Sequence, residues 1–388
     1  MKRSMIIKCS LQTTAWLAMI CISSHVYSQD KIEFYTTSAI PYHGKSIHAY
    51  FVDFADSLSG DILYQVRAGN GYPVSYHRKI RTSVCFDNKC RLLNIVVHWN
   101  ITGRYLGFEL PPGEYLSKAE HKPFTNEEYV RLHSLLSDPN SPLGTFSYNE
   151  LAPAKTESNR DIDAVSSPTA KNLLEFVVEG AAYTTYKLWH IIHGVSREEV
   201  AKLTVEVLTP ELFLEILRSA EVSDKIWALD HRHYMDETSH EIQKAILSFI
   251  TSDEFSLAES AIQAVGKKDL EYENFQILLL KTLDAANYSL KKRIIEKFAE
   301  ASEVSGPARL MLAEKLKAVS GELVTGTLDL FSAKNISDIA VCRQVATLLE
   351  NQNVFISRQA YEFLKELSLT DREIQRKLKQ YEIRHKPE

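Results

Sequence analysis

Paired helices repeat along the second half of this chain, and that repetition constrains the fold more than any other feature. From Ser196 to the end, apolar residues recur at helical spacing. The first helices of the pairs are predicted to begin near Glu241, Glu273, Pro307 and Asp338. The second helices are predicted to begin near Ser256, Ser289, Glu322 and Ile356. The starts within each series are nearly evenly spaced, at a period typical of helical-repeat proteins.

A two-helix unit of this length cannot cover its own apolar face, and it does so by stacking on its neighbours. Residues 196–388 are therefore predicted to form an all-α helical-repeat solenoid of the HEAT-like kind, a class of fold with extended binding surfaces. The segment 209–220 is interpreted as an earlier unit. The highly charged final helix, "REIQRKLKQYEIRHK", is interpreted as a terminal cap.

Residues 29–195 have a different character, which is typical of an α+β domain. Short segments rich in aromatic and β-branched residues alternate with Gly, Pro, Asn or Asp, and this pattern predicts β-strands. The segments are 31–37, 46–54, 61–69, 73–86 and 90–99. A helix is predicted over 125–138, because Thr125 can cap its first turn and Glu128 follows three positions later.

Residues 1–28 have the organisation of a secretory signal peptide. Three basic residues (Lys2, Arg3 and Lys8) precede the apolar run "AWLAMICI", which is too short to span a bilayer. Small residues at Val26 and Ser28 then predict cleavage near Ser28. The chain is therefore expected to be exported to the periplasm or the extracellular space, with no membrane span in the mature part.

Charge argues against a nucleic-acid partner. Removal of the signal peptide leaves 42 Lys and Arg against 50 Asp and Glu, so the formal charge moves from −5 to −8. An acidic chain without a basic cluster lacks the cations that neutralise a phosphate backbone.

Three cysteines follow the predicted signal peptide, and an oxidising compartment favours pairing two of them. Cys85 and Cys90 bracket the turn sequence "FDNK" between two predicted strands, so a disulfide closing a β-hairpin is the preferred interpretation. A redox-active dithiol and two free thiols are the alternatives. Cys342 lies among apolar residues at helical spacing, which indicates a buried small side chain.

The segment "DIDAVSSPT" (161–169) carries the strongest chemical signal. It resembles the signature of the FMN-binding domain in the flavin-carrying subunits of Rnf-type and sodium-pumping electron-transport complexes. The signature places Asp163, Ser166 and Thr169 on the family's Asp, Ser and Thr, and Ser167–Pro168 stand where the family has Gly and Ala. The resemblance covers roughly residues 80 to 193. It implies FMN on the Thr169 hydroxyl through a phosphoester, attached by a separate flavin transferase.

The same residues have a simpler interpretation. Ser167 can cap a helix and Pro168 suits its first position, so the helix would run over 170–178 and, after a break at Gly180, on to His193. Thr169 would then be only a polar residue at the helix start. In either case its hydroxyl would face the positive end of the helix dipole.

Two groups of histidines are candidate metal ligands. His190 and His193 lie one turn apart near a helix end, but no third ligand is near them in the sequence. The segment from Asp230 to His240 is rich in His, Asp and Glu, yet its spacing fits no zinc motif. A helix end and a polar loop between helices are the favoured interpretations.

Two functions are therefore expected. The first is an exported flavoprotein in electron transfer, with FMN on Thr169 and redox partners docking on the solenoid. The alternative is a non-enzymatic scaffold, in which a degenerate flavin domain accompanies a protein-binding solenoid. No catalytic nucleophile with its base stands out in the sequence, so whether the chain is an enzyme stays open.

Overall fold

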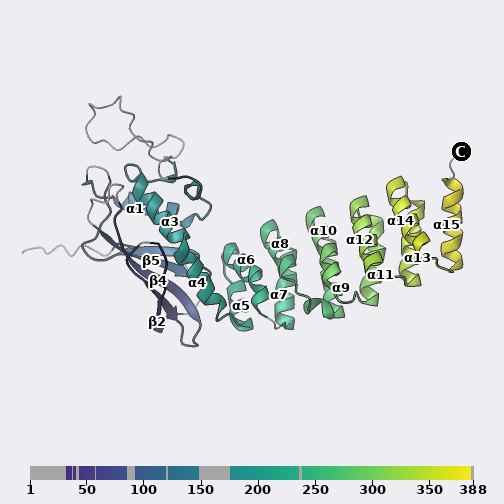
Figure 1. Cartoon of the computed structure of the whole chain (residues 1–388), viewed down its shortest axis with the longest axis horizontal. Helices are drawn as coiled ribbons and strands as arrows, with labels where there is room; N and C mark the ends of the chain where they lie inside the picture. Colours follow the sequence, from purple (N-terminus) through teal and green to yellow (C-terminus); the bar gives the residue numbers. More distant parts are fainter. Residues whose placement is uncertain are drawn as a thin grey trace, which may run out of the picture.

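A computed structural model describes residues 32–36, 38–40, 43–56, 58–84, 92–118, 121–147, 175–235 and 238–385. A β-sheet and three helices form one end of the molecule, and a row of further helices leads away from them to the C-terminus (Figure 1). The expected layout, an α+β part followed by a helical part, is confirmed.

The sheet has six strands, all antiparallel to their neighbours, in the order β1-β6-β5-β4-β3-β2. The strands are β1 Ile32–Tyr35, β2 Ser46–Phe51, β3 Ile62–Arg67, β4 Pro73–Thr82, β5 Leu93–Asn100 and β6 Tyr105–Leu110. Each of the five segments predicted as strands overlaps one of them. The connection from β1 to β2 starts at one edge of the sheet and ends at the other.

Three helices, α1 Asn126–Ser137, α3 Ala182–His193 and α4 Val195–Val205, pack on one face of the sheet. Trp99 on β5 points toward α3, where its indole nitrogen donates a hydrogen bond of 2.9 Å to the carbonyl of Ile192. The predicted capping of α1 is confirmed, because Thr125 accepts from the backbone of Glu128 and the Glu128 carboxylate accepts from the backbone of Thr125. The other face of the sheet carries the alternate residues of each strand.

The helix predicted over 170–178 is wrong in its described part. Glu175 and Phe176 lie in a short 3-10 turn, and the chain then turns at Gly180, whose φ is +74°. The α-helix begins only at Ala182, and it ends at His193 as expected. The backbone carbonyl of Glu175 accepts from Arg131 on α1, so this stretch is tied to its neighbour rather than continued as a helix.

Within the described residues from 210 to 385, the C-terminal part contains eleven α-helices, here called the helical stack. They are α5 Pro210–Leu217, α6 Val222–Asp230, α7 His240–Ile250, α8 Phe255–Ala264, α9 Glu273–Thr282, α10 Tyr288–Lys297, α11 Gly306–Lys315, α12 Gly321–Ala333, α13 Ile339–Ala346, α14 Val354–Glu366 and α15 Arg372–Arg384. Short 3-10 turns accompany the helices at Pro142–Gly144, Arg232–Tyr234, Asp269–Glu271, Phe298–Glu300, Leu316–Ala318 and Thr347–Glu350. All eight helix starts named from the sequence lie at or next to these starts, except that α14 begins slightly earlier, at Val354.

The stack is regular. The helices α6, α8, α10, α12 and α14 start at positions 222, 255, 288, 321 and 354, which are equally spaced. The helices α7, α9, α11, α13 and α15 start at positions 240, 273, 306, 339 and 372, with the same spacing. This common spacing, for example from Val222 to Phe255, is here called the repeat step.

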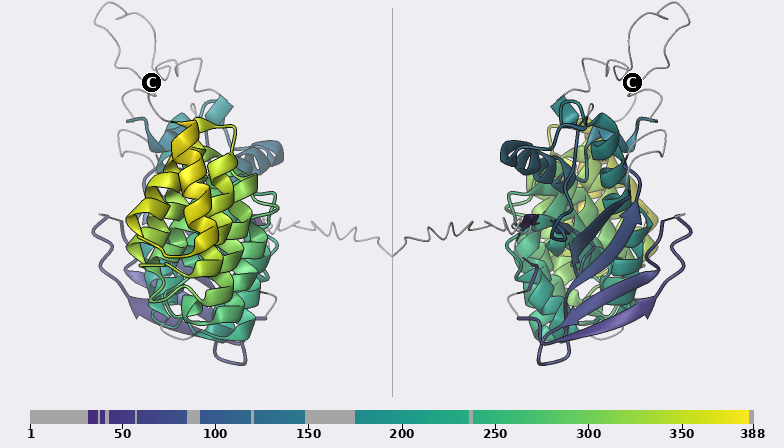
Figure 2. Two further views of the ribbon diagram at one scale, coloured as in Figure 1. Left: turned by 90° about the vertical axis from the view of Figure 1, so that its right-hand side faces the viewer. Right: turned by 90° about the vertical axis from the view of Figure 1, so that its left-hand side faces the viewer.

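Two rows of helices result from this regularity. The even-numbered helices from α6 to α14 contact one another in a row, and the odd-numbered helices from α5 to α15 form a second row (Figure 1). Seen end on, the helices of both rows lie closely behind one another (Figure 2).

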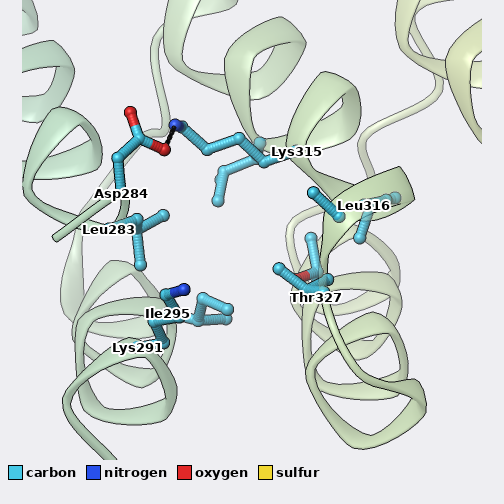
Figure 3. A pocket seen from close by; sticks show the side chains of 10 residues that line it. Leu283, Asp284, Lys291, Ile295, Lys315, Leu316 and Thr327 are labelled. Atoms are coloured by element: carbon cyan, nitrogen blue, oxygen red, sulfur yellow. Dashed lines mark hydrogen bonds and ion pairs between the residues drawn. The ribbon is translucent and has the colours of Figure 1, made fainter. Parts of the chain in front are cut away.

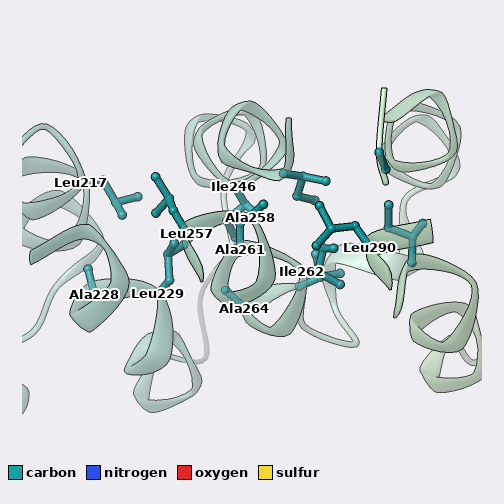
Figure 4. Packing of buried hydrophobic residues seen from close by; sticks show 14 of the residues in the cluster. Leu217, Ala228, Leu229, Ile246, Leu257, Ala258, Ala261, Ile262, Ala264 and Leu290 are labelled. Atoms are coloured by element: carbon teal, nitrogen blue, oxygen red, sulfur yellow. The ribbon is translucent and has the colours of Figure 1, made fainter. Parts of the chain in front are cut away.

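The two rows enclose a continuous apolar core. Leu229 of α6 and Leu257 of α8 meet between these two helices, and the small residues Ala258 and Ala261 of α8 lie beside Ile246 of α7 (Figure 4). Ion pairs between neighbouring units, such as that of Arg343 with Asp371, join the units along the surface. Such exposed pairs are screened by water and contribute little, so the core carries most of the stability.

Buried polar contacts fasten the sheet to the first helices. The fully buried Arg78 on β4 donates to Asp56 at 2.5 Å and to the hydroxyl of Ser196 on α4 at 2.8 Å. Its guanidinium also lies 3.5 Å from the ring centre of Phe54. A second buried group, Asp224 on α6, binds the turn between β5 and β6.

Candidate functional site

The residues of the flavin signature lie outside the described part of the chain. This holds for Asp163, Ser166 and Thr169, and also for Cys85 and Cys90. The two strands that flank the predicted disulfide, β4 and β5, do pair as an antiparallel hairpin with Thr82 opposite Leu93. Flavin attachment and the disulfide both stay predictions. Cys342 is buried as expected, and burial raises the pKa of its thiol to about 11.

His190 and His193 have a structural role. The Nε2 of His190 lies 3.1 Å from the carbonyl oxygen of Leu143, and that of His193 lies 2.9 Å from the carbonyl oxygen of Leu136. Burial lowers the pKa of His193 to about 4, so its ring is neutral at neutral pH and donates to that carbonyl. These nitrogens are therefore engaged in fixing α3 on α1 and the turn that follows it.

The histidines between Asp230 and His240 also bind backbone. The Nδ1 of His231 lies 2.7 Å from the carbonyl of Trp227, and the Nδ1 of His233 lies 2.8 Å from that of Asp230. Asp236 and Glu237 lie outside the described residues. Within the ranges that the structure covers, no group of three His, Cys, Asp or Glu side chains could hold a metal ion.

A row of rings crosses the face of the sheet that α1, α3 and α4 leave open. Its members are Tyr64 on β3, His77 on β4, His98 on β5 and Tyr35 on β1. Strand register creates the row, since Tyr64 pairs with His77 and His77 with His98. Successive ring centres lie 5.0, 5.4 and 5.3 Å apart.

Gly107 on β6 makes room for the last step of the row. It pairs with both Tyr35 and His98, and a side chain there would separate these two rings. A Cβ built on Gly107 would lie 1.8 Å from the carbonyl oxygen of Phe34 on the neighbouring strand. A glycine is therefore required at this position for β1 to approach β6.

A hollow of about 420 Å³ lies beside the row. Tyr35, His77, His98 and Glu109 line it from the sheet, and Ser38 and His43 from the stretch after β1. The Nε2 of His98 lies 2.9 Å from the Glu109 carboxylate. Burial, and then the charges of His98 and Lys79, lower the pKa of His77 to about 4. The hollow thus offers neutral imidazole, hydroxyl and carboxylate groups, which suit hydrogen bonding to a small polar molecule.

The sequence alone did not reveal this row. The only indication in the sequence is that His77 and His98 each alternate with apolar residues in a predicted strand, which places them on the face away from the core. Their meeting depends on strand register, and a shift of one residue would place them on the other face.

The helical stack contains a much smaller cavity, of about 60 Å³, between the α9–α10 and α11–α12 pairs. Leu283, Ile295, Leu316 and Thr327 point into it, and the ion pair between Asp284 and Lys315 closes one side (Figure 3). Its size suits one or two water molecules, so we regard it as a packing gap between units.

An exposed apolar row follows the stack. Phe255, Tyr288 and Val354 are the first residues of α8, α10 and α14, so they occupy one structural position in their units. Phe255 is 44% exposed, Tyr288 46% and Phe355, next to Val354, 51%. In α12 the equivalent position is Gly321, and the ring of Phe355 lies against it. The surface made by Phe255, Tyr288, Gly321 and Phe355 is here called the apolar row.

Comparison of the chain with protein-family models, curated proteins and solved structures found no match. Among the residues that the structure describes, none of the helices has both the length and the apolar character that a membrane span needs.

Proposed function

We propose that the chain is a scaffold whose helical stack is a HEAT-like α-solenoid that binds another protein. The apolar row is the observation that carries the proposal. Isolated exposed apolar residues are common on protein surfaces, but here the first residues of α8, α10 and α14 are exposed and largely apolar, and the Phe355 ring lies against Gly321 at the start of α12. A partner lying along α8, α10, α12 and α14 would meet an aromatic or aliphatic side chain at or beside each of these helix starts.

The way the sheet is attached fits a scaffold. Asp224 on α6 is fully buried, and it accepts hydrogen bonds from Asn100 and Thr102 at the end of β5. Such contacts hold a fixed geometry, because a displaced charge would remain buried without its partner. The α+β part and the stack would therefore present their surfaces in a constant relative orientation.

The test uses the full chain and a triple variant of the apolar row, Phe255→Ser, Tyr288→Ser and Phe355→Ser. Quantitative affinity capture from the native cell envelope should retain a protein with the wild type and lose it with the triple variant. Val130→Ser, which removes an exposed apolar side chain on α1, is the matched control and should retain it. The proposal fails if no retained protein distinguishes the triple variant from the control.

A flavoprotein in extracytoplasmic electron transfer is the second candidate, and the segment "DIDAVSSPT" supports it. Thr169 would carry the FMN, with Asp163 and Ser166 beside it, and the flavin would supply the electron chemistry. In this case redox partners would dock on the stack. Export, expected from residues 1–28, belongs to both proposals.

Intact mass decides between the candidates. Protein produced together with a flavin transferase should gain the mass of one FMN, less one water, and Thr169→Val should not. Unmodified mass in both proteins would eliminate the covalent flavin and leave the scaffold. A flavin that persists in the variant would mean that another residue carries it.

A further inference from the structure

Strand β2 forms an edge of the sheet, and two of its exposed side chains are large and apolar. Of the strands in the described part of the chain, only β3 pairs with it. Ile47 is 63% exposed and Phe51 is 85% exposed. Exposed edge strands with apolar side chains are templates for pairing with another chain. We propose that two copies of this protein associate through β2, antiparallel and about a twofold axis.

The backbone groups available for pairing can be identified from the ladder. The amide of Val52 donates to the carbonyl of Asp61 at 2.9 Å, so Val52 faces β3. Backbone groups alternate along an antiparallel strand, and Tyr50, His48 and Ser46 therefore also face β3. The N–H and C=O groups of Ile47, Ala49 and Phe51 then point away from the sheet.

The alternation restricts the register of a β2–β2 pair. Outward residues must face outward residues, so the two residue numbers of each facing pair add up to an even number. In the register whose facing residue numbers add up to 98, Ala49 lies on the twofold axis opposite Ala49 of the other copy. Ile47 of each copy then lies opposite Phe51 of the other copy. All outward N–H and C=O groups of these three residues are then paired. A shift by two residues in either direction leaves Ile47 or Phe51 facing a smaller or a charged residue.

Charge selects the same register. Lys45 and Asp53 flank β2, and both are exposed. The amide of Lys45 donates to the carbonyl of Arg67 at 2.7 Å, so its backbone turns toward β3 just before the regular ladder begins. Its side chain lies beside Gly69 of the β3–β4 turn, and this long, exposed side chain can turn outward to reach Asp53 of the other copy in the register centred on Ala49, which gives two ion pairs. The outer side of the strand thus complements itself in both charge and apolar side chains, as a twofold interface requires.

The first test measures the mass in solution. Sedimentation velocity of the full chain should show a monomer that converts to a dimer as concentration rises, because a short strand forms a small interface. Phe51→Lys should remain monomeric, since a lysine on an edge blocks pairing. Val130→Lys, an equal change on exposed α1, should dimerise like the wild type. A monomer at every concentration up to several hundred micromolar overturns the proposal.

The second test examines the register. Lys45→Asp places two like-charged pairs at the interface and should raise the dimer dissociation constant by about tenfold. Adding Asp53→Lys should restore association, because the swapped charges attract again. Asp53 also accepts from the backbone of Ala55, so circular dichroism must confirm that the double variant is folded.

A cysteine on the axis gives an independent readout. Facing residues of a hydrogen-bonded antiparallel pair have Cα atoms about 5.5 Å apart, a separation that a disulfide can bridge. Ala49→Cys should therefore form a covalent dimer on mild oxidation. Phe51→Cys should not, because its copy is displaced by about 13 Å along the strand. A dimer that survives Phe51→Lys and forms no crosslink through Ala49→Cys would show that the interface lies elsewhere.

Discussion

Asp224 offers the sharpest test of how the sheet and the helical stack are joined. Its carboxylate is fully buried on α6 and accepts from Asn100 and Thr102, each at 2.7 Å, and from Ser219 at 2.8 Å. The guanidinium of Arg104 lies 3.0 Å from it. We expect Asp224→Asn to weaken this junction strongly, because the new amide keeps the volume and removes the charge.

The magnitude follows from what the substitution leaves behind. Removing one partner of a buried ion pair costs about 3–5 kcal/mol. The Arg104 side chain is one-fifth exposed, so water can partly compensate its charge, and we expect a loss near the lower limit of about 3 kcal/mol. The amide can keep its oxygen toward Asn100 and Thr102, but its NH2 group then faces the Arg104 guanidinium, which cannot accept a hydrogen bond, and this prevents a smaller effect.

The assay combines urea unfolding with hydrogen exchange. The amides of Thr102 and Arg104, which bind the side chain of Asn100, should exchange faster in the variant. Asp329→Asn is the control, because that aspartate is exposed on α12, and it should change the free energy of unfolding by less than about 0.5 kcal/mol. A loss below about 1 kcal/mol for Asp224→Asn would refute the assignment of this cluster as the junction.

The same residue predicts a dependence on pH. Burial alone would raise the pKa of Asp224, but the hydrogen bond and charge of Arg104 outweigh it and hold the pKa below its usual value of 3.8. The stabilising contribution is therefore present above pH 3.8 and is lost as pH falls through the lower pKa of the folded state. This part of the acid sensitivity should be absent in Asp224→Asn.

Three further predictions follow from single residues. Gly107→Ala should detach β1 from β6, because the added Cβ would meet the Phe34 carbonyl at 1.8 Å, and protease resistance near residue 35 should fall. His193, whose pKa is lowered to about 4, should show no imidazole titration by NMR at pH 5 to 8, and it should lower stability as pH falls from 6.5 toward 4, because only the unfolded chain takes up a proton there. Cys342 should resist alkylation in the folded protein and react after denaturation, as mass spectrometry of its peptide can show.

The helices and strands were largely predictable, because local signals specify them. Apolar spacing placed the helices of the stack, and Thr125 with Glu128 marked the start of α1. The helix predicted over 170–178 is wrong in its described part. The apolar residues there are compatible with a helix, but Gly180 and the hydrogen bond from Arg131 favour turns. Local helix propensity is easily overridden by such tertiary contacts.

The contacts that join distant segments could not be predicted. Arg104 and Asp224 lie far apart in the chain, and neither stands out among the other charged residues of the sequence. The ring row likewise depends on how β3, β4, β5 and β1 align, which the alternation within each strand leaves undetermined. The apolar row could not be predicted either, because a prediction of it requires each helix start to be known to the residue. An error of one position turns a helical side chain by about 100° around the axis.

The constant repeat step has a consequence for how such a chain can change its size. Each helix pair meets its neighbours through the same two sides, so whole units can be gained or lost while the remaining contacts keep their form. Loss of residues 273–305, which span α9, α10 and the turn that follows, would bring α11 to the place of α9. An insertion or deletion of another length inside a helix would turn the residues after it out of alignment with those before it. The stack can therefore gain or lose whole units without disturbing its core, and each unit changes the distance between the sheet and the C-terminal helix by one fixed increment.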